Sequence, residues 1–273
     1  MHKDMPSDSV VSPKTLGSQA LVLATAAAVV GPLMYVAVTL LHPPGMPGND
    51  HPAVFREYAM AQTWTAVHLA QLAGLVVGLV GIAGLAASLV RLEENGRLFA
   101  LLAVGLVAAS IPIALVLQAV DGIALKRAVD AWVVEGGTVE SASFAAARAI
   151  RWLEEGLSAV FGVTLGSAAI LVGVAMLRGT VYPRWIGWIG AALGIGVLIN
   201  GILVAETGFS PAAQIWVFMR NPGLWIWTAV AGALMWRRLP LLDAAVRTTS
   251  PGSGEVPGRA AQRRGGTNRP ARG

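Results

Sequence analysis

The sequence predicts an all-α fold, a polytopic membrane helix bundle of about six transmembrane helices, in which helices three and four project beyond the outer face. Of the 273 residues, 55% are hydrophobic and 13% are charged, whereas soluble domains carry about 25% charged residues. The apolar residues are gathered in runs of about 20, the length that crosses a bilayer as a helix. A helix also satisfies its own backbone hydrogen bonds, as the interior of a bilayer requires.

Six apolar runs are candidates for membrane-crossing helices. They cover residues 20–41, 66–90, 98–120, 156–177, 185–205 and 222–238. The first run is longer than the apolar part of a signal peptide, and no strong positive cluster precedes it, so we expect it to be retained. The sixth run is the weakest, because Arg220-Asn221-Pro222 interrupts the sequence before it, although Pro222 suits a first helical turn. The chain thus divides into a cytoplasmic tail (1–19), a six-helix transmembrane domain (20–238) and a disordered basic tail (239–273).

The segments between the apolar runs predict further helices. After HPPGMPGNDHP, the stretch AVFREYAMAQTW has an amphipathic pattern. Residues 121–155 contain two helical patterns that meet at Glu135-Gly136-Gly137, and either Thr138 or Ser141 can cap the second. We therefore expect a helical hairpin that extends the third and fourth helices. The stretch SPAAQIWVFMR (210–220) predicts a separate interfacial helix capped by Ser210.

Lysine and arginine predict the orientation of the chain. If both termini share one side, that side holds 14 of the 20 Lys and Arg residues, eight of them from Arg237 onward. Cytoplasmic segments carry the excess of positive charge, so both termini are predicted to be cytoplasmic. Without the C-terminal tail the two sides are equal, so this prediction depends on the tail. Arg outnumbers Lys 17 to 3, which favours a GC-rich bacterial genome and hence the bacterial cytoplasmic (inner) membrane.

Composition also limits the partners and cofactors of a protein in the lipid bilayer. The chain has no cysteine, which excludes disulfides, thiolate catalysis, iron–sulfur clusters and cysteine-type zinc sites. Much of the net charge of +5 comes from the C-terminal tail, so we expect anionic lipids at that tail and no nucleic acid partner. No cofactor is predicted. Glycine pairs predict close helix packing, either within one bundle or across a homodimer face. They are Gly74 and Gly78, Gly162 and Gly166, and Gly190 and Gly194.

A layer of polar residues is predicted at one depth, the outer interface of the membrane. From Arg91 back to His68 is 23 residues, and three other arginines lie at similar spacings from Asp121, Glu155 and Glu206. At 1.5 Å per residue these spacings are roughly 33–36 Å, slightly more than the thickness of the hydrocarbon core. Charges gather wherever a membrane ends, so an interface without any site is the alternative. The residues of the candidate polar pocket are His42, His68, Gln71, Asp121, Lys126, Arg151 and Glu155.

The residue types in this layer limit its chemistry. Histidine with carboxylates can ligate zinc or iron or relay protons. The weak candidates for a metal site are His42, His68, Asp121 and Glu155. No HExxH motif is present, so a metal site would have to be assembled across helices, as would paired histidine ligands to a haem. Salt bridges that cross-link the base of the hairpin would instead be structural, and the residues that could form them are Asp121, Lys126, Arg151, Glu154 and Glu155.

Several stretches of the chain resemble a family of bacterial multi-pass membrane proteins of unknown function, frequent in actinobacteria. The matching stretches are LHP (41–43), WTAVH (64–68), LQAVDGIALKRAVDAW (117–132), RWLEEGLSAVFG (151–162) and YPRWIGWIG (182–190). The resemblance covers roughly residues 20–238 and implies a six-helix membrane domain. It implies nothing about a substrate.

Three functions remain open on the sequence alone. The first, which the sequence favours, is a non-enzymatic membrane protein: a small transporter, sensor or accessory component with an outward-facing polar pocket. The second is a metal-dependent membrane enzyme that uses the outer His/Asp/Glu layer. The third is a structural or assembly module that pairs through its glycine faces.

Overall fold

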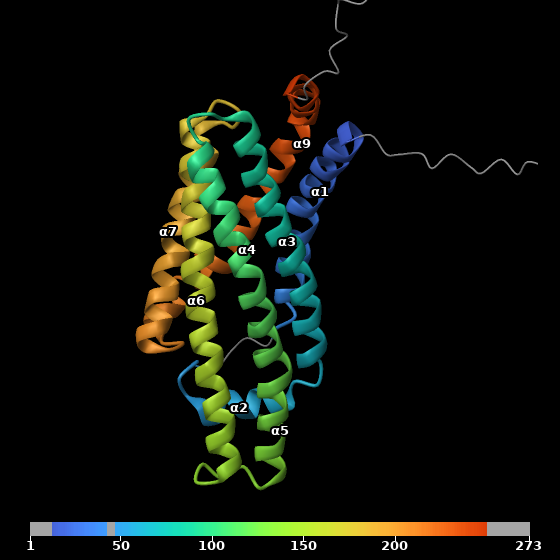
Figure 1. The fold of residues 1–273 in the computed structure, drawn as a ribbon. Helices are drawn as coiled ribbons and strands as arrows, with labels where there is room; N and C mark the ends of the chain where they lie inside the picture. Colours follow the sequence, from blue (N-terminus) through green and yellow to red (C-terminus); the bar gives the residue numbers. More distant parts are fainter. Residues whose placement is uncertain (1–12, 43–46, 250–273) are drawn as a thin grey trace, which may run out of the picture.

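The computed structural model describes residues 13–42 and 47–249, and every regular element in these residues is a helix (Figure 1). The long helices are α1 (Pro13–Thr39), α3 (Trp64–Leu92), α4 (Arg97–Ala119), α6 (Ala142–Arg178), α7 (Arg184–Thr207) and α9 (Leu224–Thr249). The short elements are α2 (His51–Met60), α5 (Lys126–Val134), α8 (Pro211–Gln214) and two π-helical turns, η1 (Val120–Leu125) and η2 (Met219–Gly223). The predicted all-α bundle is therefore confirmed.

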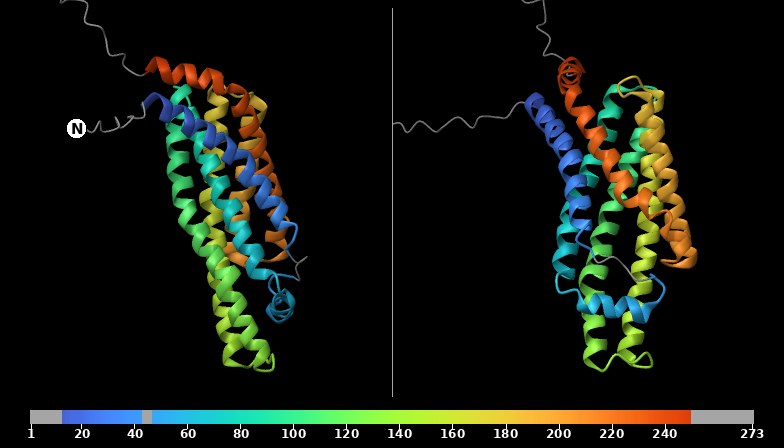
Figure 2. Two further views of the ribbon diagram at one scale, coloured as in Figure 1. Left: turned by 90° about the vertical axis from the view of Figure 1, so that its right-hand side faces the viewer. Right: turned by 180° about the vertical axis from the view of Figure 1, so that it is seen from behind.

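Five helical runs in the described residues are long and apolar enough to cross a membrane. They are Gln19–Thr39, Trp64–Leu92, Arg97–Val134, Ala142–Arg178 and Arg184–Thr207. They lie side by side in one elongated bundle, and α9 packs beside α1 and α3 (Figures 1 and 2). These runs contain the second to fifth predicted helices and nearly all of the first, which ends at Thr39 rather than at residue 41. A membrane crossing by α9 stays a prediction.

The two terminal helices are longer than predicted. α1 begins at Pro13 rather than near residue 20, and α9 continues to Thr249, so residues 239–249 are helical where the sequence predicted a disordered tail. Pro240 lies inside α9, and a proline bends a helix without always ending it. The C-terminal part of α9 turns across the end of the bundle in Figure 2. The remainder of the predicted basic tail, with its lipid contacts, lies outside the described residues.

The predicted hairpin is present at one end of the bundle, which we call the hairpin end (Figure 1). α4 continues through η1 into α5, and α6 contains 37 residues, about 55 Å of helix, which exceeds the thickness of a hydrocarbon core. Gly136 and Gly137 form the turn with φ angles of 102° and 67°, which glycine adopts readily. Of the two candidate caps, Ser141 caps α6, because its Oγ accepts a hydrogen bond from the N–H of Phe144 at 3.1 Å.

α2 lies across the base of the hairpin, where the sequence predicted an amphipathic segment (Figure 2). Asp50 caps this helix by accepting a hydrogen bond from the N–H of Ala53 at 3.2 Å. Phe55 is fully buried, and its ring lies 6.0 Å from Trp132 of α5 and 5.7 Å from Phe144 of α6. This apolar contact ties α2 to both arms of the hairpin.

The segment before α9 differs from its prediction. Ser210 does cap a helix, because its Oγ accepts a hydrogen bond from the N–H of Ala213 at 3.3 Å, but this helix, α8, has only four residues. The chain then enters η2, which contains Pro222 and leads directly into α9. The prediction of one helix over residues 210–220 is therefore wrong in its length, since nothing in the local pattern indicates a π-helical turn.

The predicted glycine faces are used inside the bundle. A Cβ at Gly74 would lie 2.7 Å from the backbone nitrogen of Tyr35 in α1, and one at Gly78 would lie 2.8 Å from the Trp225 ring of α9. The same close approach to α6, α7 or α9 occurs at Gly162, Gly166, Gly190 and Gly194. These faces bring helices of one chain together, so a homodimer would have to use other surfaces.

Candidate functional site

A cavity of about 380 Å³ lies near the hairpin end, between the ends of α1 and α3, the η1 turn, α6 and the segment that precedes α9. We call it the polar cavity, because most of its lining side chains are polar. Its polar lining residues are Tyr35, Thr39, His42, Tyr58, His68, Gln71, Gln118, Asp121, Arg151, Glu154, Ser158, Gln214, Arg220 and Asn221. Its remaining lining residues are Gly48, Leu117, Phe209 and Val217.

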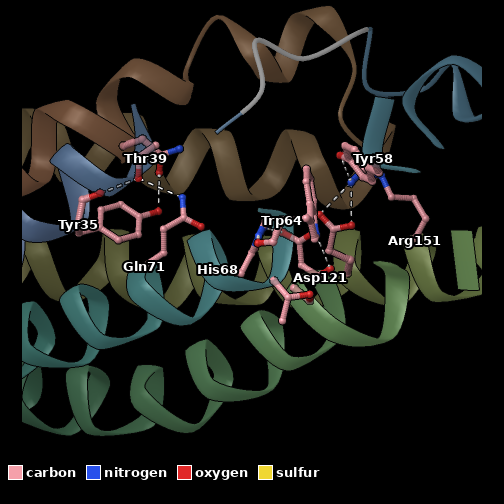
Figure 3. A network of polar contacts seen from close by, with 12 residues as sticks. Tyr35, Thr39, Tyr58, Trp64, His68, Gln71, Asp121 and Arg151 are labelled. Carbon is pink, nitrogen blue, oxygen red and sulfur yellow. Dashed lines mark hydrogen bonds and ion pairs between the residues drawn. The ribbon is translucent and has the colours of Figure 1, made fainter. Parts of the chain in front are cut away.

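His68 and Asp121 form a hydrogen-bonded pair between α3 and η1 (Figure 3). Nε2 of His68 lies 3.0 Å from Oδ2 of Asp121, and Nδ1 of the same ring lies 2.8 Å from the carbonyl oxygen of Trp64. His68 is almost fully buried, whereas the Asp121 side chain keeps 18% of its surface exposed. Oδ1 of Asp121 has no hydrogen-bond partner among the described residues. The pair therefore presents one free carboxylate oxygen beside the cavity.

The π-helical turn η1 explains how Asp121 reaches this position. Nε1 of Trp64 donates to the carbonyl of Asp121 at 3.0 Å, and Oγ1 of Thr65 donates to the carbonyl of Gly122 at 2.8 Å. Gly122 lies so close to His68 that a Cβ there would collide with the Cβ of the histidine. π-helical turns are rare and occur often at functional sites. Side chains of α3 thus hold η1 in place, and the missing Cβ lets the two elements approach.

A second buried pair lies on α6. Nη1 of Arg151 donates to Oε2 of Glu154 at 2.7 Å and to the hydroxyl of Tyr58 at 3.0 Å. The guanidinium also lies 4.4 Å from the centre of the Phe209 ring. Burial raises the pKa of the Tyr58 hydroxyl well above its usual range, so Tyr58 stays neutral. Because Tyr58 is neutral, Glu154 is the residue that compensates the charge of Arg151. Nε of Arg151 has no hydrogen-bond partner among the described residues.

The opposite wall of the cavity is built by α1, α3 and η2 (Figure 3). Nε2 of Gln71 donates to Oγ1 of Thr39 at 3.1 Å, and Oγ1 of Thr39 donates to the carbonyl of Tyr35 at 2.7 Å. The hydroxyl of Tyr35 reaches Oδ1 of Asn221 at 3.4 Å, the long limit of a hydrogen bond. The neighbouring Arg220 donates to Oγ of Ser158 on α6 at 2.7 Å. Most side chains of this wall are therefore neutral. Arg220 is the one arginine or lysine that this wall contributes to the described cavity lining, and Arg151 lies on the other wall.

The structure brings five of the seven predicted pocket residues to the polar cavity, namely His42, His68, Gln71, Asp121 and Arg151. Lys126 does not line it, because its Nζ binds Oδ1 of Asp130 at 2.6 Å and the carbonyl of Ala59 at 3.2 Å on the hairpin. Glu155 does not line it either, because it lies beside Gly208. Adjacent residues on a helix point roughly 100° apart, so Glu154 lines the cavity beside Arg151 and the predicted Glu155 does not.

Glu154, Tyr58 and Arg220 are three charged or aromatic residues of the cavity lining that the predicted pocket does not include. The spacing of three residues between Arg151 and Glu154 is a helical ion-pair spacing, from which the sequence predicts only a structural salt bridge for Glu154. For Arg220 the sequence indicates only an interruption before the sixth helix. No local pattern marks Tyr58, because its place depends on how α2 crosses the hairpin.

The four weak metal candidates do not form a metal site. No group of three or more His, Asp or Glu side chains within the described residues could hold a metal ion. The ring of His42 lies 5.4 Å from that of His68, centre to centre, and Glu155 lies outside the cavity lining. His68 and Asp121 are hydrogen-bonded at 3.0 Å, whereas the contact between His42 and His68 is one of ring against ring.

The chain matches no family model, no curated protein and no solved structure. The resemblance to a bacterial family of multi-pass membrane proteins therefore stays a prediction.

Proposed function

We propose that this protein is an integral membrane protein that binds a small polar ligand in the polar cavity, as a small transporter, a sensor or an accessory component. Five helices long and apolar enough to cross a membrane support the membrane location. The volume of about 380 Å³ falls within the range of ligand sites, about 300–1,000 Å³.

The observation that carries this proposal is a set of unpaired polar atoms on residues of the cavity wall. Oε1 of Gln118, Oδ1 of Asp121 and Nε of Arg151 are buried and have no hydrogen-bond partner among the described residues. Leaving such an atom unpaired costs about 1–3 kcal/mol, and more if it is charged. Water or a polar ligand in the cavity would recover this free energy. Acceptors and a donor together favour a ligand that carries both kinds of group.

The other two functions have less support. A metal-dependent enzyme would use His42, His68, Asp121 and Glu155 together, and they are not gathered at one point. An assembly module would pair through its glycine faces, and those faces are covered by helices of the same chain. Neither function explains why polar side chains from eight separate elements surround one cavity.

We further propose that the protein lies in a bacterial cytoplasmic membrane with both termini in the cytoplasm, which puts the polar cavity on the outer side. The distribution of Lys and Arg supports this orientation. An outward-facing cavity would meet ligands from outside the cytoplasm.

A melting experiment on the purified full-length protein tests the ligand proposal. The probes are a panel of carboxylates, phosphates, amines and polyols, each added to protein in a neutral detergent. A ligand present at 100 times its Kd stabilises the folded state by about 2.7 kcal/mol, so at least one probe should raise the melting temperature by a few degrees. Gln71→Leu and Asp121→Asn should reduce this shift.

The matched control removes a polar contact at the other end of the bundle. Tyr182 is buried, and its hydroxyl lies 3.2 Å from Oγ of Ser88, far from the cavity lining. Tyr182→Phe should therefore keep the full ligand shift of the parent. A panel in which no probe moves the parent's melting temperature would contradict the proposal.

A further inference from the structure

Arg220 is a cation of the polar cavity without a carboxylate partner in the described part of the chain. Its Nη1 donates to Oγ of Ser158 at 2.7 Å, and its guanidinium lies 5.4 Å from the centre of the Phe161 ring. The two carboxylates that line the cavity are already engaged, Asp121 with His68 and Glu154 with Arg151. A guanidinium whose remaining N–H groups are free in a polar cavity is suited to a phosphate or carboxylate.

A smaller, apolar cavity of about 90 Å³ adjoins the polar cavity. The two share Tyr35, Thr39 and Asn221, and the smaller one is completed by Val36, Leu40 and Pro222. It therefore lies between the end of α1 and the π-helical turn η2 that carries Arg220. Leu40 is 80% exposed, so this crevice reaches the outer surface of the bundle, where lipid chains lie in a membrane.

The spacing along α3 predicts that the polar cavity lies at the depth of lipid head groups. It is bordered by the last turn of α1 and the first turns of α3, and His68 lies 23 residues from Arg91 along α3. This spacing is about 35 Å, slightly more than a hydrocarbon core. Trp64 and Tyr58, whose ring centres are 3.9 Å apart, lie at the same level, as aromatic residues do at membrane interfaces.

From these contacts we infer that the ligand of the polar cavity is an anionic membrane amphiphile that enters sideways between α1 and η2. Its phosphate binds Arg220 and Ser158, and its hydroxyl or ammonium groups donate to the free oxygens of Asp121 and Gln118. Its acyl chain leaves through the crevice between Val36, Leu40 and Pro222. This inference rests on the proposed function and specifies the ligand class for the same cavity.

Binding of three matched probes to the full-length protein in neutral detergent tests the inference. Lysophosphatidic acid carries both head and chain, glycerol 3-phosphate is the head alone, and monoacylglycerol is the chain without phosphate. Lysophosphatidic acid should bind at least about tenfold more tightly than either fragment, because only it uses both cavities. Arg220→Gln should weaken the binding of lysophosphatidic acid by about tenfold or more, because hydrogen bonds to a charged group are lost. Arg220→Lys should restore part of this affinity.

A second variant tests the crevice independently of the charge. Val36→Phe fills the apolar cavity, so it should weaken the binding of lysophosphatidic acid and leave the binding of glycerol 3-phosphate unchanged. Two controls keep the cavity intact: Arg148→Gln removes an arginine of the hairpin that packs on Phe144 and Trp152, and Val30→Phe enlarges an exposed residue of α1. Both should bind like the parent.

Two results would overturn the inference. One is equal affinity for glycerol 3-phosphate and lysophosphatidic acid, which would make the ligand a free anion. The other is an Arg220→Gln variant that binds lysophosphatidic acid like the parent. In either case the proposed function stands if another polar probe still binds and loses affinity in Asp121→Asn. If no probe of any class binds, the proposed function itself is contradicted.

Discussion

Nε2 of His68 lies 3.0 Å from Oδ2 of Asp121, while Nδ1 of the same ring lies 2.8 Å from a backbone carbonyl oxygen. A carbonyl oxygen only accepts, so Nδ1 must carry a hydrogen. Nε2 and Oδ2 therefore hold one further proton between them, as an imidazolium with a carboxylate or as a neutral imidazole with a carboxylic acid. Either form makes the two side chains a single protonation unit in the wall of the polar cavity.

Removing His68 should cost more stability than neutralising Asp121. His68→Ala leaves a mostly buried carboxylate without its partner, a change that typically costs about 3–5 kcal/mol. Asp121→Asn puts an amide N–H opposite the neutral Nε2 and keeps one hydrogen bond, so it should cost about 1 kcal/mol or less. Melting temperatures of the two single variants and the double variant measure the coupling. Losses that simply add in the double variant would show that the side chains do not act as a unit.

The hydroxyl of Tyr58 should contribute more than that of Tyr182. Tyr58 accepts a hydrogen bond from the buried guanidinium of Arg151 at 3.0 Å, whereas Tyr182 pairs with the neutral hydroxyl of Ser88 at 3.2 Å. Hydrogen bonds to charged groups contribute about 1.5–3 kcal/mol and neutral ones about 0.5–1.5 kcal/mol. Tyr58→Phe should therefore lower the melting temperature more than Tyr182→Phe. A larger loss in Tyr182→Phe would contradict the assignment of Tyr58 as a partner of the buried cation.

Two helical glycines should respond oppositely to substitution by alanine. A Cβ at Gly122 would collide with the Cβ of His68, whereas a Cβ at Gly105 of α4 meets nothing within 4 Å. Gly122→Ala should separate α3 from η1 and loosen the contact between His68 and Asp121, so it should lower both stability and ligand binding. Gly105→Ala should be neutral or stabilise by up to about 1 kcal/mol, because alanine favours the helix. Thermal melting of both variants checks this contrast.

The fold was predictable because it depends on properties that can be read locally. Long apolar runs gave the five candidate membrane helices, and helical spacing on both sides of Gly136-Gly137 indicated the hairpin. Counting residues from the arginines predicted that His68 and Asp121 share one level, and the structure brings the two side chains into contact. Depth along a helix follows from the sequence because each residue adds a fixed rise.

The direction in which a side chain points was less predictable. Glu154 and Glu155 are neighbours in the sequence, yet only Glu154 meets Arg151 and lines the cavity, and packing decides which one faces inward. Arg220 reaches Ser158 across 62 residues, through a π-helical turn that has no clear sequence pattern. Contacts between distant segments therefore set the parts of the site that the sequence did not indicate.

His51 should make stability depend on pH through the short helix α2. Burial, with the charges of Arg151 and Arg148, lowers the pKa of His51 below its ordinary value, although Asp50 acts in the opposite direction. A lowered pKa means that the folded state binds the proton less well than the unfolded chain. The stability is then complete above the unfolded pKa of about 6.5 and is lost as the pH falls through the folded pKa. Melting from pH 7.5 to 5 should show a smaller decrease in His51→Gln than in the parent.

Single cysteines should show which side of the membrane holds the polar cavity. The chain has no cysteine, so each introduced thiol is unique. Glu140 is exposed in the turn of the hairpin, and Glu94 is exposed in the turn between α3 and α4 at the opposite end of the bundle. In intact bacterial cells, a membrane-impermeant maleimide should label Glu140→Cys and should label Glu94→Cys only after lysis, because the excess of Lys and Arg predicts cytoplasmic termini. Solubilised protein, in which both thiols should react, is the control. The reverse pattern would put the cavity on the cytoplasmic side and restrict its ligand to molecules of the cytoplasm or the inner leaflet.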